Sequence, residues 1–221
     1  MNAQEINKAN LAYSLGGFIV FSIGILAWGF VFDKGDLILF FSERRHWFVD
    51  YFFYYASFMG EAYIYIFFTL LLLFHNYGKS LVVGLTGGLV MASALLLKAF
   101  FMHHRPYRYF TEYVDPPISI NYIPYVELHS GYTTSFPSGH TMSAFAIYTL
   151  IALWSKHTTI KILCLLTATL VAISRIYLVQ HFLKDVLAGL VLGYLIGLLM
   201  YGLSQQFKNK KILQGKIKKP V

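Results

Sequence analysis

The sequence predicts an all-α, polytopic membrane protein with six transmembrane helices in a single bundle. The composition supports this prediction, because 57% of the 221 residues are hydrophobic and only 13% are charged, against about 25% in soluble domains. The apolar residues also gather in six stretches, each close to the ~20 residues that a helix needs to cross a bilayer. Lysine and arginine are biased towards one set of ends of these stretches, as in membrane proteins whose basic ends face the cytoplasm.

The predicted spans follow one another along residues 1–221, which we treat as one membrane-embedded domain. The N-terminal residues lack the basic region and cleavage site of a signal peptide, so the first apolar stretch is expected to remain as a span. A short apolar run after it, Leu37–Phe41, predicts a helix in the membrane interface. The six predicted spans are Leu11–Phe32, Tyr51–Phe74, Ser80–Phe101, Ser138–Trp154, Thr159–Leu178 and His181–Leu203.

The last two spans are separated by a single turn. Thr159–Leu203 contains 45 mostly apolar residues, which as one helix would be roughly 67 Å long, about twice the hydrocarbon core of a bilayer. The chain must therefore fold back once, and Gln180–Asp185 is the polar place for the bend. A turn there lets Arg175 face His181, while Asp185, four residues further on, shares a helix face with His181.

Basic residues set the predicted orientation. The tail from about residue 205 to residue 221 holds six lysines, which places it in the cytoplasm by the positive-inside rule. Counting back through alternating spans puts the N-terminus in the cytoplasm as well. The same count brings the outer ends of spans three to six together, and we expect the active site there, on the periplasmic or extracellular side of a bacterial inner membrane.

Composition also excludes some classes of function. The net charge of +8 would suit a nucleic-acid-binding protein, but the high apolar content excludes that class. A lone cysteine, Cys164, rules out an intrachain disulfide and any metal site made of several cysteines.

Three polar clusters fall at matching depth at the predicted outer ends, and the first runs from Lys98 to Pro106. Lys98 and Arg105 are seven residues apart, so they point the same way if the helix continues that far. Pro106 predicts that the helix ends near His104 or Arg105. Snorkelling of Lys98 towards the headgroups is the alternative explanation, although intramembrane charges usually mark function.

The second cluster is Ser135–His140, which contains the tetrapeptide Pro137-Ser138-Gly139-His140 directly before an apolar run. Proline followed by serine and glycine predicts a helix start, whose free backbone N–H groups and positive dipole end bind anions. His140 in the first turn is then placed to donate a proton to a leaving group. Taken alone, the tetrapeptide is better explained as a helix cap with an interfacial histidine, so its assignment depends on the other clusters.

The third cluster is Ser174–Asp185, and the three together supply three cations, exposed N–H groups, two histidines and one carboxylate. This set suits phosphoryl transfer: cations and N–H groups hold the phosphoryl oxygens, one histidine attacks and the other protonates the leaving oxygen. Asp185 is expected to accept the Nδ1–H of His181, which leaves Nε2 free to attack phosphorus. A transition-metal site is disfavoured because three fixed cations would repel a divalent ion.

The motifs Lys-x6-Arg-Pro, Pro-Ser-Gly-His and Ser-Arg-x5-His-x3-Asp closely resemble the three-part signature of the type 2 phosphatidic acid phosphatase superfamily. The resemblance implies a membrane lipid phosphatase that uses no metal or other cofactor and forms a phosphohistidine intermediate. It also implies roles for eight residues: His181 as nucleophile, Asp185 as its orienting acid, His140 as general acid, and Lys98, Arg105, Ser138, Gly139 and Arg175 as binders of the substrate phosphate.

We therefore predict an integral membrane phosphatase that removes the terminal phosphate of a membrane lipid and has no nucleic-acid partner. Undecaprenyl diphosphate is the first candidate substrate, with phosphatidylglycerophosphate and the phosphates of lipid A close behind. Two other interpretations remain open: transfer of the phosphate to a second lipid, and a non-catalytic transporter that binds phosphate at the same place.

Four residues outside the motifs have no assigned role. Glu61 lies within the second predicted span, where a bare carboxylate is costly; it either pairs with a motif cation or hydroxyl or is a protonated packing residue. His103, His104 and Arg108 adjoin the first cluster. They are placed to touch a second phosphate or a headgroup, although solvated loop positions are the favoured interpretation.

Overall fold

The computed structural model describes residues 34–128, 134–207 and 215. The regular structure of these residues is entirely helical, and three stretches, Tyr77–Glu112, Thr158–Tyr177 and Leu183–Gln206, are long and apolar enough to cross a membrane. The helices are α2 (Asp36–Glu43), α3 (Trp47–Phe58), α4 (Ala62–Leu73), α5 (Tyr77–Phe101), α6 (Pro106–Glu112), α7 (Gly139–Trp154), α8 (Thr158–Tyr177) and α9 (Leu183–Gln206).

Four of the predicted spans correspond to single helices, namely α5, α7, α8 and α9. The first predicted span, Leu11–Phe32, lies outside the described residues. The short helix expected around Leu37–Phe41 is present as α2, whose residue Ile38 is buried.

The second predicted span is a bent pair and not one helix, which corrects the prediction. The chain breaks between α3 and α4 and turns by 53°, and the pair adds a fourth candidate span if it is counted as one crossing. Gly60 lies in this break, where a Cβ atom would stand 2.7 Å from the backbone oxygen of His140. The break therefore brings the second span into close contact with the start of α7.

Helix α7 is the centre of the bundle. Ten of its 16 residues are buried, and it packs against α5, α8 and α9. The hydroxyl of Tyr65 on α4 donates a hydrogen bond to the Ser143 carbonyl of α7 at 2.8 Å. Because α7 touches so many neighbours, its position fixes the second polar cluster relative to the other two.

A glycine stripe on α9 allows α7 and α9 to approach closely. A Cβ at Gly189 would lie 2.5 Å from the Ser138 carbonyl oxygen, and one at Gly197 would lie 2.9 Å from that of Ala146. Between them, a Cβ at Gly193 would meet the Met142 carbonyl carbon at 2.9 Å. The small-residue stripe therefore serves helix packing within one chain.

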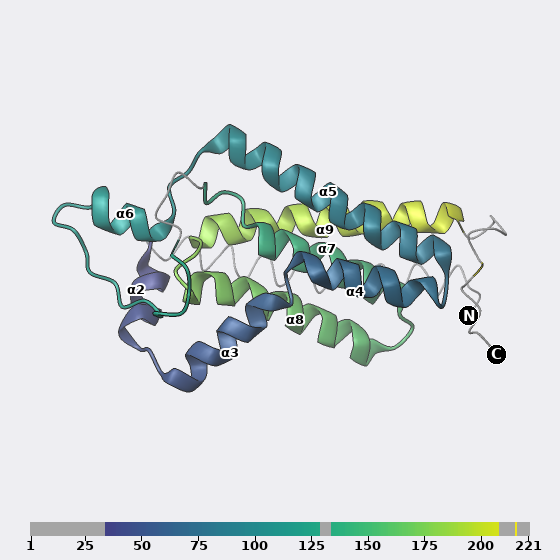
Figure 1. Cartoon of the computed structure of the whole chain (residues 1–221), viewed down its shortest axis with the longest axis horizontal. Helices are drawn as coiled ribbons and strands as arrows, with labels where there is room; N and C mark the ends of the chain where they lie inside the picture. The colour runs from purple at the N-terminus through teal and green to yellow at the C-terminus, as the bar shows by residue number, and fades with distance from the viewer. Residues whose placement is uncertain (1–33, 129–133, 208–214, 216–221) are drawn as a thin grey trace.

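The helices run up and down, so that four chain segments meet at one end of the bundle (Figure 1). The end of α5, the start of α7, the end of α8 and the start of α9 lie at the end that also carries α2 and α6. At the opposite end, the backbone N–H of Tyr77 donates to the carbonyl of Gly215 at 2.9 Å. All three polar clusters predicted from the sequence thus lie at one end of the molecule.

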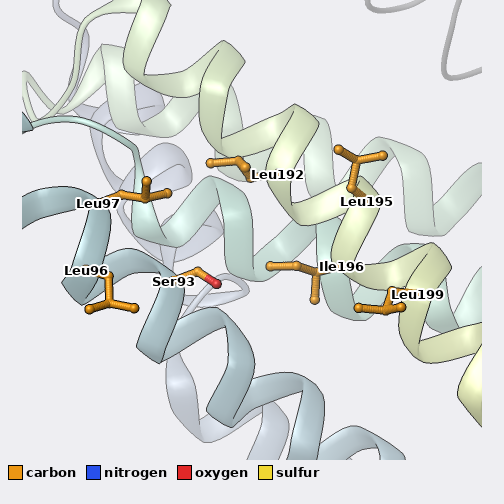
Figure 2. A pocket seen from close by; sticks show the side chains of 7 residues that line it. All are labelled: Ser93, Leu96, Leu97, Leu192, Leu195, Ile196 and Leu199. Carbon is orange, nitrogen blue, oxygen red and sulfur yellow. The ribbon is translucent and has the colours of Figure 1, made fainter. Parts of the chain in front are cut away.

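A groove of about 370 Å³ opens between α5 and α9 (Figure 2). It contains none of the predicted site residues, so it does not carry the phosphate chemistry. Its lining is apolar apart from one hydroxyl and consists of Ser93, Leu96, Leu97, Leu192, Leu195, Ile196 and Leu199.

Candidate active site

The site is built around His181, which lies in the turn between α8 and α9. Val179 adopts a left-handed φ of 60° in this turn, and the backbone N–H groups of Gln180 and His181 both donate to the Arg175 carbonyl, at 3.0 and 3.1 Å. The turn closes the end of α8 and directs His181 inward, where its side chain is buried. The predicted fold-back at Gln180–Asp185 agrees with this geometry.

Ser135 lies between His181 and Asp185, which corrects the predicted direct contact. The Nδ1 of His181 is 3.8 Å from Asp185 Oδ2, beyond hydrogen-bonding distance. Ser135 Oγ instead donates to Asp185 Oδ2 at 2.5 Å and lies 3.3 Å from His181 Nδ1. A hydroxyl has a single proton, and Ser135 uses it in the hydrogen bond to Asp185. In the second hydrogen bond His181 Nδ1–H must therefore be the donor and Ser135 Oγ the acceptor. The lone pair of His181 is therefore on Nε2, as a nucleophile requires.

Burial lowers the pKa of the His181 imidazole to about 3. The nearby carboxylate of Asp185 opposes this shift, whereas the guanidiniums of Arg105 and Arg175 add to it. The imidazole is consequently neutral at physiological pH, although it lies beside a carboxylate.

Two buried guanidiniums flank His181, each held by a residue to which the motifs assign no role. Arg105 Nη1 donates to the side-chain oxygen of Gln180 at 3.1 Å and to its carbonyl at 3.3 Å. Arg175 Nη1 donates to the hydroxyl of Ser57, the only buried residue of α3. The Nε atoms of both arginines are buried with no partner in the described part of the chain, so each retains a donor for an anion.

Helix α5 ends earlier than predicted. It stops at Phe101, and Met102 turns into the left-handed region at φ 43°. Arg105 is therefore the N-cap of α6 and does not continue the helix that carries Lys98. Lys98 still lies against the second motif, because a Cβ at Gly139 would be 3.9 Å from its Nζ.

The second motif forms the N-terminus of α7 as predicted, with Ser138 as N-cap. The backbone N–H of Ser138 is not free, however, because it donates to the Asp185 carbonyl at 2.9 Å. The hydroxyls of Ser138 and Thr141 form a hydrogen bond with each other at 2.9 Å. The N–H groups available to an anion are thus those of the first turn itself, at Gly139 and His140.

His140 has a partner on the second span. Its Nε2 lies 2.6 Å from Glu61 Oε1, so Glu61 pairs with a residue of the second motif and is not a bare carboxylate. Both side chains are partly exposed, 27% for His140 and 37% for Glu61. The pair lies at the open side of the site, whereas His181 and Asp185 are enclosed.

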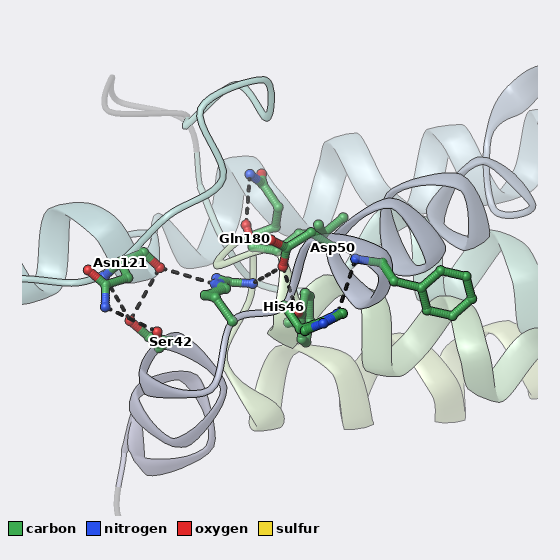
Figure 3. A network of polar contacts seen from close by, with 9 residues as sticks. Ser42, His46, Asp50, Asn121 and Gln180 are labelled. Carbon is green, nitrogen blue, oxygen red and sulfur yellow. Dashed lines mark hydrogen bonds and ion pairs between the residues drawn. The ribbon is translucent and has the colours of Figure 1, made fainter.

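A polar network ties the outer loops to this end of the bundle (Figure 3). Gln180 belongs to this network as well as to the site, since its side-chain nitrogen donates to the Glu127 carbonyl at 2.9 Å. Further out, Ser42 Oγ accepts from the Asn121 backbone N–H at 2.8 Å, and Tyr177 donates to Asp50 at 2.5 Å. The loop after α6 is thereby held over the turn that carries His181.

The other three unassigned residues have local partners. The guanidinium of Arg108 pairs with Glu112 at 2.6 Å, and the His104 ring stacks on Tyr113 at a centroid distance of 4.4 Å. The carbonyl of His103 accepts the backbone N–H of Ser135 at 2.8 Å. The contacts of Arg108 and His104 account for these two side chains without a second phosphate, whereas His103 Nδ1 is buried with no hydrogen-bond partner among the described residues.

Sequence reasoning placed Ser135 in the second cluster and Gln180 in the bend of the third, but gave neither residue a role in the site. Ser135 stands three residues before Ser138, and Gln180 directly precedes His181, so a buried hydroxyl or amide beside each motif was the available signal. Within the described residues, no three His, Cys, Asp or Glu side chains gather as a metal site would need.

Comparison with known proteins gives one family match. The family model described as the PAP2 superfamily matches residues 77–209, a segment that contains all three motifs. Phosphatidylglycerophosphatase B of Bacillus subtilis (strain 168) is 42% identical over 84 residues. This alignment covers 34% of the chain and only 41% of that relative.

Two solved structures share the fold. The crystal structure of Aquifex aeolicus LpxE has a TM-score of 0.64 and 28% identity, and the match covers 76% of this chain and 94% of that one. The first transmembrane PAP2 type phosphatidylglycerolphosphate phosphatase from Bacillus subtilis also has a TM-score of 0.64, with 21% identity, covering 90% and 98% of the two chains. At 21% identity this second likeness concerns the fold alone.

Proposed function

The chain belongs to the PAP2 superfamily, and from this membership we propose that it is an integral membrane phosphatase that hydrolyses a phosphorylated membrane lipid. The observation that carries the proposal is the neutral His181, fixed by Ser135 and Asp185 and flanked by two guanidiniums with unused donors. A neutral imidazole with Nε2 free is the nucleophile that a phosphoryl transfer without metal requires.

The reaction proceeds in two steps at these residues. Lys98, Arg105, Arg175 and the first-turn N–H groups of α7 hold the phosphoryl oxygens and stabilise their charge. The Nε2 of His181 attacks phosphorus as the bond to the lipid oxygen breaks, and His140 protonates that oxygen. In the second step water displaces His181 from phosphorus and returns its proton to His140. Asp185 acts through Ser135, which accepts the Nδ1–H of the phosphorylated imidazole.

The proposed substrate class is a lipid phosphate. One similar protein is named phosphatidylglycerophosphatase B, so phosphatidylglycerophosphate becomes the leading candidate ahead of undecaprenyl diphosphate. Lipid A phosphates remain in the same class, because the cradle recognises the phosphate and not the lipid.

We also propose that the site faces the outside of a bacterial inner membrane, with both termini in the cytoplasm. The lysine-rich tail supports this orientation by the positive-inside rule. Labelling single cysteines placed at residue 122 and residue 215, in a chain whose Cys164 is replaced by Ala, tests it in intact cells. An impermeant reagent should reach residue 122 alone.

A panel of purified lipid phosphates tests the function. The wild-type chain should release inorganic phosphate with no acceptor lipid present, which separates hydrolysis from phosphotransfer, and kcat/KM ranks the substrates. His181→Asn should abolish turnover while the protein remains folded in detergent. Normal rates in this variant, or phosphate flux into liposomes without release, would refute the proposal.

A further inference from the structure

We propose that Glu61 is a positioning residue of the active site: its carboxylate holds His140 by Nε2 and stabilises the imidazolium form that protonates the leaving oxygen. The inference deepens the proposed function and depends on it. It adds the bent second span to a site that the three sequence motifs assign to the later helices only.

The contact is short, and it joins Glu61 to a residue of the second motif. Glu61 Oε1 lies 2.6 Å from His140 Nε2, within the range of a charge-assisted hydrogen bond. Glu61 is the N-cap of α4, but its side chain makes no capping hydrogen bond.

The backbone on both sides of Glu61 is fixed to the site. A Cβ at Gly60 would lie 2.7 Å from the His140 backbone oxygen and 2.8 Å from a methyl carbon of Val171. The Tyr148 hydroxyl of α7 donates to the Met59 carbonyl at 3.1 Å. Ser57, one turn earlier, accepts a hydrogen bond from Arg175. These contacts hold the break in the second span against α7 and α8. The position of the backbone from which Glu61 reaches His140 is therefore fixed.

The charges around His140 explain why it needs a carboxylate. Lys98 from α5 and Arg175 from α8 both face its imidazole, and Glu61 is the facing group from the break in the second span. A further positive charge beside two fixed cations is unfavourable in a partly buried site. Asp185 is committed elsewhere, because its Oδ2 already accepts from Ser135 and from the Phe182 N–H at 3.0 Å. Glu61 is thus the carboxylate that opposes these two cations and favours the imidazolium of His140.

The two imidazoles of the site therefore have opposite tasks and separate carboxylates. Because Nε2 of His140 is bound by Glu61, the proton available for transfer is on Nδ1. It passes to the lipid oxygen as the P–O bond breaks, and His140 becomes neutral with Nε2–H still bonded to Glu61. In the second step the attacking water gives a proton back to Nδ1 as its oxygen bonds to phosphorus and the bond from phosphorus to His181 breaks.

Leaving groups of different basicity test this role. We would prepare the full-length chain as wild type and as Glu61→Gln, and measure kcat/KM on dodecyl phosphate and on the phosphate of a nitrophenol that carries the same dodecyl chain. An alkoxide needs the proton and a nitrophenolate does not. The variant should lose about 10- to 100-fold on the alkyl ester, a part of the ~10²–10⁴-fold effect of general acid catalysis, and less than about threefold on the aryl ester.

The pH profile gives a second measurement that a purely structural residue would not move. Without the carboxylate His140 gives up its proton more readily, so the alkaline limb of kcat/KM for dodecyl phosphate should shift to lower pH by at least about one unit. Combining Glu61→Gln with His140→Asn should cost no more than His140→Asn alone, since both changes remove one function. The matched control is Glu43→Gln, an exposed carboxylate on α2 beside Arg44, which should leave both profiles unchanged.

The outcomes are distinguishable. Equal losses on the two esters, or an unshifted alkaline limb, would overturn the role of Glu61 while the wild type remains a phosphatase. A wild type that cleaves neither ester overturns the proposed function, and the inference with it. If Glu61→Gln does not fold, Glu61→Asp, whose carboxylate ends one methylene further from Nε2, undergoes the same two measurements with the same expected signs.

Discussion

Replacing Gly193 by alanine should measure how far the bundle depends on the close approach of α7 and α9. The added Cβ would lie 2.9 Å from the Met142 carbonyl carbon and closer still to its oxygen, a clash with backbone that no rotamer change relieves. Overpacking of this kind costs about 1–3 kcal/mol, and in a chain of this size each kcal/mol shifts Tm by about 2–4 °C. Gly193→Ala should therefore lower Tm by about 2–12 °C.

Gly202→Ala is the matched control for this experiment. Gly202 lies on the same helix, but a Cβ there would meet nothing within 4 Å. Since alanine is favoured over glycine in a helix interior by about 1 kcal/mol, Gly202→Ala should keep or raise Tm. Thermal unfolding of the purified variants in one detergent, followed by tryptophan fluorescence, gives both values. A Tm for Gly193→Ala equal to or above that of Gly202→Ala would refute the packing argument.

Three further predictions concern the site. Ser135→Ala removes the bridge between Asp185 and His181 and should lower kcat about 10- to 100-fold, the equivalent of one hydrogen bond to a charged group. The control is Ser80→Ala, which replaces a buried serine near the start of α5, away from the site, and should leave kcat unchanged. Since burial lowers the pKa of His181 to about 3 from 6.5, the unfolded chain binds a proton that the folded chain lacks between these values, and stability should fall as the pH drops below 6.5. This contribution to stability changes by at most about 1.4 kcal/mol per pH unit, and it should be absent in His181→Asn. The Tm values of the wild type and of this variant, measured at pH 7.5, 6.0 and 5.0, should therefore converge or cross as the pH falls. EDTA should leave the rate of phosphate release unchanged, and a loss restored by Mg²⁺ would contradict the proposed chemistry.

The parts of the fold that follow from local sequence were predictable. Apolar runs of about 20 residues located α5, α8 and α9, because in lipid the backbone must satisfy its own hydrogen bonds and helices do so within one segment. The fold-back before His181 followed from length alone. The early end of α5 did not, since it depends on the distant contact between the His103 carbonyl and the Ser135 N–H.

The site differs from its prediction where the deciding contact joins residues far apart in the chain. Ser135 is 50 residues from Asp185, and Glu61 is 79 from His140, so no spacing within a motif reveals either pair. The same holds for the break at Gly60, whose cause is the nearby backbone of His140. Periodicity describes which face of a helix is apolar, but not how closely another backbone approaches it.

The charge balance of the site links these misses. Three cations bind phosphate strongly only in a low-dielectric environment, and that environment also opposes a protonated His140 and favours a neutral His181. In the proposed mechanism one carboxylate cannot serve both imidazoles, because His181 is held neutral with its proton on Nδ1 and His140 is held positive. Asp185 lies fully buried behind His181, and Glu61 lies on the partly exposed side next to His140. The bent second span thus brings its own carboxylate to the site, with Glu61 Oε1 2.6 Å from His140 Nε2.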